Sequence, residues 1–188
     1  SQVQVLPRAL LHLVDGVFRG IVTRKEHEGS AFRLHQGNRM VVLSGSNSRL
    51  LAEQLAASLG WEHHQLETRR FPDSEGYIRI PSETIEAVRK EPVVLVSNTF
   101  PDAGIVETLL MLEAINDVRK GNMANLREIA PQNMDDVGPG ILLAVPYFGY
   151  SCQDKRFKPG EAISARAIGH LLASRCDGII VFDLHAPS

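Results

Sequence analysis

The amino-acid sequence predicts an α/β fold in which a mostly parallel sheet carries helices on both faces. Four short apolar runs have the length and composition of buried parallel strands, and they lie at 40–43, 93–96, 141–145 and 178–182. Stretches with helical spacing of apolar residues lie among these runs, and such alternation is typical of a parallel sheet covered on both faces. Ligands of such sheets bind outside the carboxyl ends of the strands, so the loops after the four runs are candidate functional regions.

The composition is that of an ordinary soluble domain, which we expect to be cytoplasmic. The chain has 188 residues, 44% of them hydrophobic, and a formal net charge of −2. This length suits one domain with a sizeable core. The balanced charge argues against a nucleic-acid partner, and no apolar run approaches the roughly 18 residues of a membrane span. Cys152 and Cys176 lack the spacing of a zinc motif and fit a reducing compartment.

Residues 1–39 differ from the rest and are interpreted as an N-terminal extension of a domain at 40–188. Apolar residues within 6–22 recur at close to helical spacing, which predicts a helix. This helix is either a surface helix, docked on the domain or on a neighbour, or an organelle-import segment. Import segments are poor in acidic residues, so Asp15 and Glu26 count against the second alternative.

The first apolar run leads into a loop of small residues and then into a predicted helix. Leucines at every fourth position predict the helix, which is expected to end at Gly60. Asn47 or Ser48 is expected to cap its first turn. The same helix start could instead offer free backbone N–H groups to an anion, although the loop lacks the Gly-Lys-Ser/Thr ending of a Walker loop. Both interpretations stay open at this point.

Residues 62–80 are expected to be extended and to form a hairpin-like excursion around a Pro-Asp-Ser-Glu-Gly turn. His63 and His64 are adjacent, so on a strand their side chains point to opposite faces and cannot chelate one metal together. We interpret both histidines as surface residues.

The apolar run at 93–96 leads into the longest predicted helix, with Asp102 as its expected N-cap and Gly121 just past its end. Its apolar stripe consists of Ile105, Leu109, Leu112 and Ile115. Residues 121–139 interrupt the rhythm of the sequence and are expected to form a surface insertion.

The loop after the run at 141–145 carries the densest functional chemistry. An amide, an acid and three bases lie between Gln153 and Lys158, where a loop could present them to a charged ligand. A helix is predicted over 161–175. The residues expected on its buried side are Ile163, Ala167, Ile168, Leu171 and Leu172.

Asp183 and His185 follow the last apolar run and point to the same side if the strand geometry persists. A carboxylate beside an imidazole at a sheet edge could bind a divalent metal or serve as an acid and a base. The alternative is a histidine that caps the strand or bonds to the backbone.

Several motifs, in their order along the chain, resemble the amino-terminal half of the ribose-phosphate diphosphokinases, the phosphoribosyl pyrophosphate synthases. The motifs are Phe71-Pro72-Asp73-Ser74-Glu75, Pro146-Tyr147-Phe148-Gly149-Tyr150, the run from Gln153 to Glu161, Ile163-Ser164-Ala165 and Asp183-Leu184-His185-Ala186-Pro187. The resemblance covers residues 40–188. It implies a phosphoribosyltransferase-like (Rossmann-like) domain that binds a nucleotide.

The first motif reaches across a subunit interface to ATP in this family. The resemblance therefore implies stacking by Phe71, polar contacts by Asp73 and Glu75, and a homo-oligomer with a nucleotide site shared between subunits. The alternative for Phe71 is packing on its own domain. Ser74 stands where glycine is usual, and because serine tolerates fewer backbone conformations we expect a differently shaped turn.

The family's Arg-Gln-Asp run contacts ATP and reads Cys152-Gln153-Asp154 in this chain. Cys152 therefore replaces an arginine that is expected to make a charge-assisted contact with the nucleotide. The family's Asp-Leu-His-Ala histidine binds Mg²⁺, which implies that His185 is a metal ligand and catalytic residue, with Asp183 beside it.

The implied reaction is attack by the C1 hydroxyl of ribose 5-phosphate on the β-phosphorus of ATP, with transfer of the diphosphoryl group and release of AMP. Magnesium and cationic groups stabilise the charge that develops on the phosphates. The family's carboxyl-terminal domain, with its ribose 5-phosphate loop, does not follow Ser188, so the chain alone is expected to be inactive. Control by phosphate and ADP is not expected, because Lys158-Pro159-Gly160 stands where the family uses serine and arginine.

Two other functions stay open. The chain could belong to a regulatory or associated subunit that keeps the fold and the oligomer contacts but has lost catalysis, as Cys152 and Ser74 would permit. It could also be some other nucleotide or phosphosugar binder on the same fold.

Overall fold

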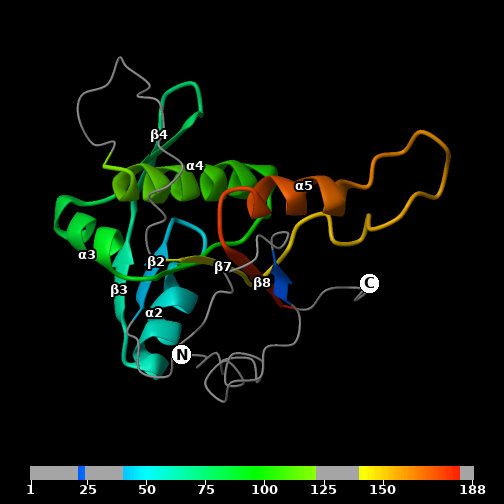
Figure 1. Ribbon diagram of the computed structural model, residues 1–188. Helices are drawn as coiled ribbons and strands as arrows, with labels where there is room; N and C mark the ends of the chain where they lie inside the picture. The colour runs from blue at the N-terminus through cyan, green and yellow to red at the C-terminus, as the bar shows by residue number, and fades with distance from the viewer. Residues whose placement is uncertain (1–20, 24–39, 122–139, 183–188) are drawn as a thin grey trace, which may run out of the picture.

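The computed structural model describes residues 21–23, 40–121 and 140–182, and these form a sheet covered by helices (Figure 1). The strands are β1 Ile21–Thr23, β2 Val41–Ser44, β3 Glu62–Gln65, β4 Glu67–Arg70, β5 Gly76–Arg79, β6 Val93–Val96, β7 Ile141–Val145 and β8 Gly178–Val181. The helices are α2 Arg49–Leu59, the 3₁₀ turn η1 Ser82–Thr84, α3 Ile85–Lys90, α4 Asp102–Arg119 and α5 Ser164–Ala173.

The main sheet has six strands in the order β1-β8-β7-β6-β2-β3, and β4 pairs with β5 in a separate hairpin. The strands from β8 to β3 are parallel, and β1 alone runs antiparallel, pairing Ile21 with Ile180. The predicted α/β class with a mostly parallel sheet is confirmed. All four predicted apolar runs are strands of this sheet.

The sheet separates two apolar cores because successive side chains of a strand point to opposite faces. Val93 and Leu95 of β6 face the core shared with α3, α4 and α5, whereas Val94 and Val96 face the core shared with α2. Figure 1 shows α4 and α5 on one side of the sheet and α2 on the other, as the sequence predicted.

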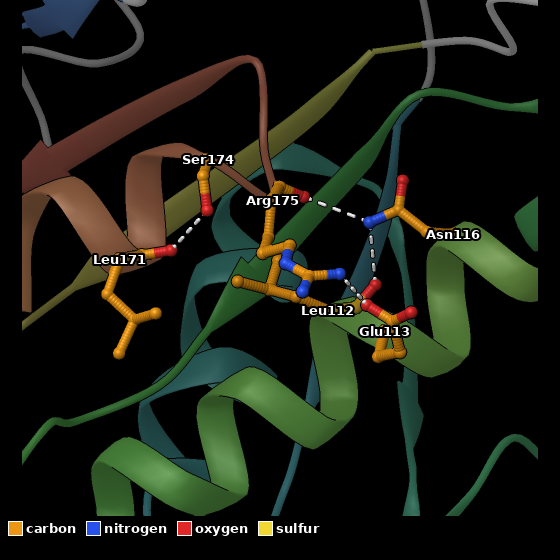
Figure 2. Close-up of polar contacts among 6 residues, drawn as sticks. All are labelled: Leu112, Glu113, Asn116, Leu171, Ser174 and Arg175. Carbon is orange, nitrogen blue, oxygen red and sulfur yellow. Dashed lines mark hydrogen bonds and ion pairs between the residues drawn. The ribbon is translucent and has the colours of Figure 1, made fainter. Parts of the chain in front are cut away.

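Polar contacts join α4 to the chain that follows α5 (Figure 2). The Asn116 amide donates to the carbonyl of Leu112, at 2.8 Å, and to that of Arg175, at 3.0 Å. The guanidinium of Arg175 forms an ion pair with Glu113, and the Ser174 hydroxyl donates to the Leu171 carbonyl at 2.7 Å. These contacts fix the end of α5 beside α4.

Arg119 ties the end of α4 to two other elements. Its guanidinium donates to the carbonyls of Val88, at 3.2 Å, and Glu91, at 3.1 Å, at the end of α3, and to that of Gly140, at 3.4 Å, before β7. Burial lowers the pKa of Arg119 to about 10, and Asp177 opposes this shift. Arg119 therefore stays protonated at neutral pH and acts as a structural cation.

The structure corrects three predictions about helices. Ile21 and Val22 lie in β1 rather than in a helix, because the edge of β8 offers hydrogen-bond partners; residues 6–20 of the predicted helix lie outside the described residues. The long helix begins at Asp102, with Pro101 at the N-cap position. Glu161 precedes α5 because its carboxylate is used to close the loop before that helix.

The predicted buried side of α5 is also partly wrong. Leu172 is fully buried, whereas Ala167 and Leu171 are exposed. Only one stripe of this helix faces the core, because α5 lies beside α4 at the edge of the helices that cover this face of the sheet. No described helix is long and apolar enough to span a bilayer.

Candidate functional site

The loops after β2, β6 and β7 meet at the carboxyl edge of the sheet, and Asn98 joins all three. Its backbone N–H donates to Ser48 Oγ at 3.0 Å and to Asn47 Oδ1 at 3.3 Å. Its side-chain oxygen accepts from the Tyr147 N–H at 2.9 Å, and its carbonyl accepts from Asn47 Nδ2 at 3.0 Å. These bonds fix the relative positions of the three loops.

A second set of bonds fixes the loop after β7 against the loop after β6. Thr99 Oγ1 accepts from the Gly149 N–H at 2.7 Å, and the Thr99 N–H donates to the Tyr147 carbonyl at 3.2 Å. A Cβ atom on Gly149 would lie 2.4 Å from the Thr99 carbonyl oxygen. Only glycine allows the two backbones to approach this closely.

Tyr150 adds a contact from the same loop to the start of α4. Its hydroxyl donates to Asp102 Oδ1 at 2.8 Å, and this bond with the carboxylate raises the pKa of the phenol. The backbone of Tyr150 has a φ of 67°, a conformation uncommon for a residue other than glycine.

The loop after β2 does not form the side-chain cap of α2 that the sequence predicted. Ser48 occupies the N-cap position of α2, but its hydroxyl donates to Asn47 Oδ1 at 2.9 Å and makes no capping bond. The Ser46 N–H donates to Glu107 Oε1 at 2.6 Å, and the Ser46 hydroxyl donates to Oε2 at 2.7 Å. A carboxylate of α4 thus takes the Ser46 donors and holds the loop against α4, whereas the anion-binding interpretation of the helix start stays a prediction.

The segment Cys152-Gln153-Asp154 lies in the loop after β7, and Gln153 is the residue most firmly held. Its N–H donates to the Tyr150 carbonyl at 2.9 Å, and its side-chain oxygen accepts from Ser164 Oγ at 2.9 Å. Cys152 and Asp154 are exposed on either side of it. The sequence prediction of a presented polar loop therefore agrees with the geometry.

Glu161 closes the basic part of this loop. Its Oε2 accepts from the backbone N–H groups of Phe157, at 2.8 Å, and Lys158, at 3.0 Å. The guanidinium of Arg156 donates to the Glu161 carbonyl at 2.8 Å. The exposed cations of this segment are Lys155, Arg156 and Lys158.

The hairpin of β4 and β5 presents the other predicted ligand residues at its tip. The Phe71 N–H donates to the Glu75 carbonyl at 2.9 Å, and the Glu75 N–H donates to Asp73 Oδ1 at 3.1 Å. The Arg69 guanidinium lies 4.9 Å from the ring centroid of Phe71. Ser74 has a φ of 75°, so the serine adopts the left-handed backbone conformation that glycine favours.

The hairpin of β4 and β5 packs on α4 and projects away from the loop after β7 (Figure 1). Phe71 is 38% exposed, and its ring meets that of Tyr77 edge-on with centroids 5.9 Å apart. The structure therefore places Phe71, Asp73 and Glu75 together, but in a group separate from Gln153.

His63 and His64 are half-buried, so their interpretation as surface residues is wrong. His63 lies in β3 next to β2, where its Nε2 and the buried Ser44 Oγ share a hydrogen bond of 2.8 Å. Burial lowers the pKa of His63; Glu53 opposes this shift, and His64 and Arg49 add to it. The residue thus favours the neutral form.

His63 predicts a pH dependence of stability. Its folded-state pKa lies below the ordinary 6.5, so the unfolded chain takes up the proton more readily and stability falls as the pH drops below about 6.5. We expect the His63→Gln variant, whose amide keeps a partner for Ser44, to lose less unfolding free energy between pH 7 and pH 5. Urea unfolding at both pH values measures this, and an equal loss in both proteins would contradict it.

Asp183 and His185 lie outside the described residues, so the geometry of the predicted metal site is not tested. Within the described ranges 40–121 and 140–182, no group of three or more His, Cys, Asp or Glu side chains could hold a metal ion. The predicted insertion at 121–139 also lies outside them, except for Gly121, which follows α4 with a φ of 73°.

Two features of this edge were missed by the sequence analysis. Asn98 has no motif around it, although an asparagine two residues after the end of a buried strand is a signal for an edge residue. Phe100 and Tyr147 form an exposed aromatic pair with centroids 5.7 Å apart. Its two members are 47 positions apart along the chain, so periodicity could not pair them.

Comparisons with known proteins agree with this geometry. Residues 40–124 match the family described as the N-terminal domain of ribose phosphate pyrophosphokinase. The ribose-phosphate pyrophosphokinase of Methanothermobacter thermautotrophicus is 36% identical over 148 residues, covering 77% of this chain and 44% of that protein. That of Methanosarcina acetivorans is 35% identical over 150 residues, covering 79% of this chain and 44% of that protein. The chain thus spans less than half the length of these curated relatives.

A solved structure supports the fold. The crystal structure of phosphoribosylpyrophosphate synthetase from Mycobacterium smegmatis superposes with a TM-score of 0.60 at 23% identity, covering 79% of this chain and 44% of that chain. The described residues define an α/β domain with helices on both faces of a mostly parallel sheet and with polar loops at the carboxyl edge of that sheet. Over residues 40–124, the chain is similar to the N-terminal domain of ribose phosphate pyrophosphokinase, in agreement with the resemblance that its motifs indicated.

Proposed function

We propose that this chain supplies the ATP-binding half of a ribose-phosphate pyrophosphokinase, which transfers the diphosphoryl group of ATP to ribose 5-phosphate. The observation that carries the proposal is the placement of Gln153, fixed in the loop after β7 at the edge where parallel sheets bind ligands. The family match of the same chain supplies the substrate class.

The loop after β7 is suited to an anionic nucleotide. Ser164 holds the side-chain oxygen of Gln153, so the amide N–H groups are oriented as donors for a phosphate or base oxygen. The three cations from Lys155 to Lys158 supply positive charge on the same loop. Cys152 contributes neither a charge nor a strong donor at the position where the family has arginine.

The hairpin tip would serve a neighbouring copy. Phe71, Asp73 and Glu75 are displayed away from Gln153, on a turn that backbone bonds and Arg69 hold in shape. An exposed aromatic ring with two carboxylates suits the base and ribose hydroxyls of a nucleotide bound to another subunit. The proposed function therefore requires a homo-oligomer in which each ATP site is shared between two subunits.

Asp183 and His185 would hold Mg²⁺, since a carboxylate and an imidazole directly after β8 are suitable ligands. When bound, Mg²⁺ would offset charge on the transferring phosphates. The residues of this chain would bind and orient ATP so that its β-phosphorus faces the C1 hydroxyl of ribose 5-phosphate. The ribose 5-phosphate site would come from the half of the protein that the relatives have beyond this match.

The test is ATP binding by the Cys152→Arg variant, measured by titration calorimetry with Mg²⁺ present. We expect arginine to restore a charge-assisted bond to the nucleotide and to raise the affinity about tenfold, or ~1.4 kcal/mol. Cys152→Met, which adds length without charge, is the matched control and should leave the affinity unchanged.

Absence of ATP binding by both the original protein and the Cys152→Arg variant would overturn the proposed function. ATP binding that does not change with arginine would show that Cys152 lies away from the nucleotide. An active full-length relative whose arginine at this position is replaced by cysteine would test the regulatory alternative. Retained formation of AMP would show that cysteine is compatible with catalysis, and its loss would favour a regulatory subunit.

A further inference from the structure

Two aromatic side chains stand exposed on adjacent loops at the carboxyl edge of the sheet. Phe100, in the loop after β6, is 63% exposed, and Tyr147, directly after Pro146 in the loop after β7, is 55% exposed. Their ring centroids are 5.7 Å apart at an interplanar angle of 77°. In this edge-to-face arrangement, each ring keeps a face that the other does not cover.

The backbone on both sides of this pair is held rigidly. The Tyr147 N–H donates to Asn98 Oδ1 at 2.9 Å, and the Tyr147 carbonyl accepts from the Thr99 N–H at 3.2 Å and from Thr99 Oγ1 at 3.3 Å. All these bonds join backbone atoms of Tyr147 to Asn98 or Thr99, and none of them involves the ring of Phe100 or of Tyr147. The backbone that carries Tyr147 is therefore fixed, and truncating either ring leaves these loop bonds in place.

Exposed aromatic rings on a rigid support are suited to stack on a planar ligand, since little conformational entropy is lost on binding. Stacking of a nucleobase on a protein aromatic ring is one of the stronger sequence-tolerant contacts available to nucleotides. Gln153 and the cations of the loop that follows could engage the phosphates of the same ligand. Cys152 offers no planar group for the base.

We propose that Phe100 and Tyr147 form a stacking surface for the base of the bound nucleotide. This inference rests on the proposed ATP-binding function and adds two residues that determine the affinity for the base. It predicts that the two rings act on the base and not on the phosphates.

The experiment compares two probes on the whole chain with Mg²⁺ present, namely ATP and inorganic tripolyphosphate, which lacks a base and a ribose. Phe100→Ala and Tyr147→Ala should each weaken ATP binding by about tenfold and leave tripolyphosphate binding within twofold of the original. Phe100→Leu, which stays apolar but has no ring face, should lose as much ATP affinity as Phe100→Ala. Leu171→Ala removes another exposed apolar side chain and should change neither affinity.

Unchanged ATP affinity in both ring variants would overturn this inference while leaving the proposed function intact, because ATP would still bind. Equal losses for ATP and tripolyphosphate would overturn it as well, since the rings would then act through the loop and not on the base. Failure of the original chain to bind ATP would instead overturn the proposed function. Sedimentation velocity of the same variants identifies the competing role, since loss of an oligomer without loss of ATP affinity would assign the rings to a contact with a second copy.

Discussion

The Gly149→Ala variant is expected to lose about 3 kcal/mol of unfolding free energy. Its new Cβ would lie 2.4 Å from the Thr99 carbonyl oxygen, which is backbone and cannot rotate away. The loops after β6 and β7 would have to separate, and the bond from the Gly149 N–H to Thr99 Oγ1 would lengthen or break. Since these loops carry the candidate site, ATP affinity should fall together with stability.

Gly169→Ala is the matched control for this prediction. Gly169 lies inside α5, and its added Cβ would approach only the Phe148 ring, at an ordinary 3.9 Å. Alanine favours the helix over glycine by about 1 kcal/mol, so this variant should be as stable as the original or more so. Guanidinium unfolding of both variants makes the comparison. A Gly149→Ala protein as stable as the original would show that the two loops can move apart at little cost.

The sequence predicted the four central strands of the sheet, β8, β7, β6 and β2, because each of them had a local signal. The runs at 93–96 and 141–145 are continuously apolar, and both are fully buried between helix layers. The long helix was equally clear, since Ile105, Leu112 and Ile115 of its predicted stripe are buried and Leu109 is partly buried. A local sequence pattern is sufficient to predict a strand or a helix where burial determines which residue types the element contains.

Contacts between distant segments could not be predicted in this way. The strand β1 has only three residues, and its pairing with β8 depends on an open sheet edge elsewhere in the chain. The closure of the basic loop by Glu161 shortens the predicted helix, and it depends on backbone N–H groups of Phe157 and Lys158 that have no sequence signature. Such long-range and backbone-directed bonds are specified by the fold as a whole.

The candidate site was predicted through motif resemblance rather than periodicity. The structure places Gln153 in a fixed loop and Phe71, Asp73 and Glu75 on a separate hairpin tip. One copy therefore does not bring the two groups together, in keeping with a site completed by a neighbour. The links made by Asn98 carry no motif, yet they determine how the loops are arranged at the candidate site.

Arg119→Met should be the most destabilising substitution away from the site, with a loss of about 2.5 kcal/mol. Methionine keeps much of the apolar stem but leaves the carbonyls of Val88, Glu91 and Gly140 without the donors that Arg119 supplies. It also removes the cation that faces Asp177, whose Oδ2 accepts from the Ile141 N–H at 2.6 Å. The end of α3 and the start of β7 would therefore loosen together.

Arg175→Met is the matched control because it removes the same side chain from an exposed ion pair. The Arg175 and Glu113 side chains are 49% and 42% exposed (Figure 2), and pairs of this kind contribute about 1 kcal/mol or less. Urea unfolding should separate the two variants by more than about 1 kcal/mol, and 0.5 M salt, which screens exposed charges, should shrink only the Arg175 effect. Equal losses of unfolding free energy in the two variants would show that Arg119 contributes no more to stability than an exposed cation. The junction of α3, α4 and β7 would then be stabilised by its apolar contacts alone.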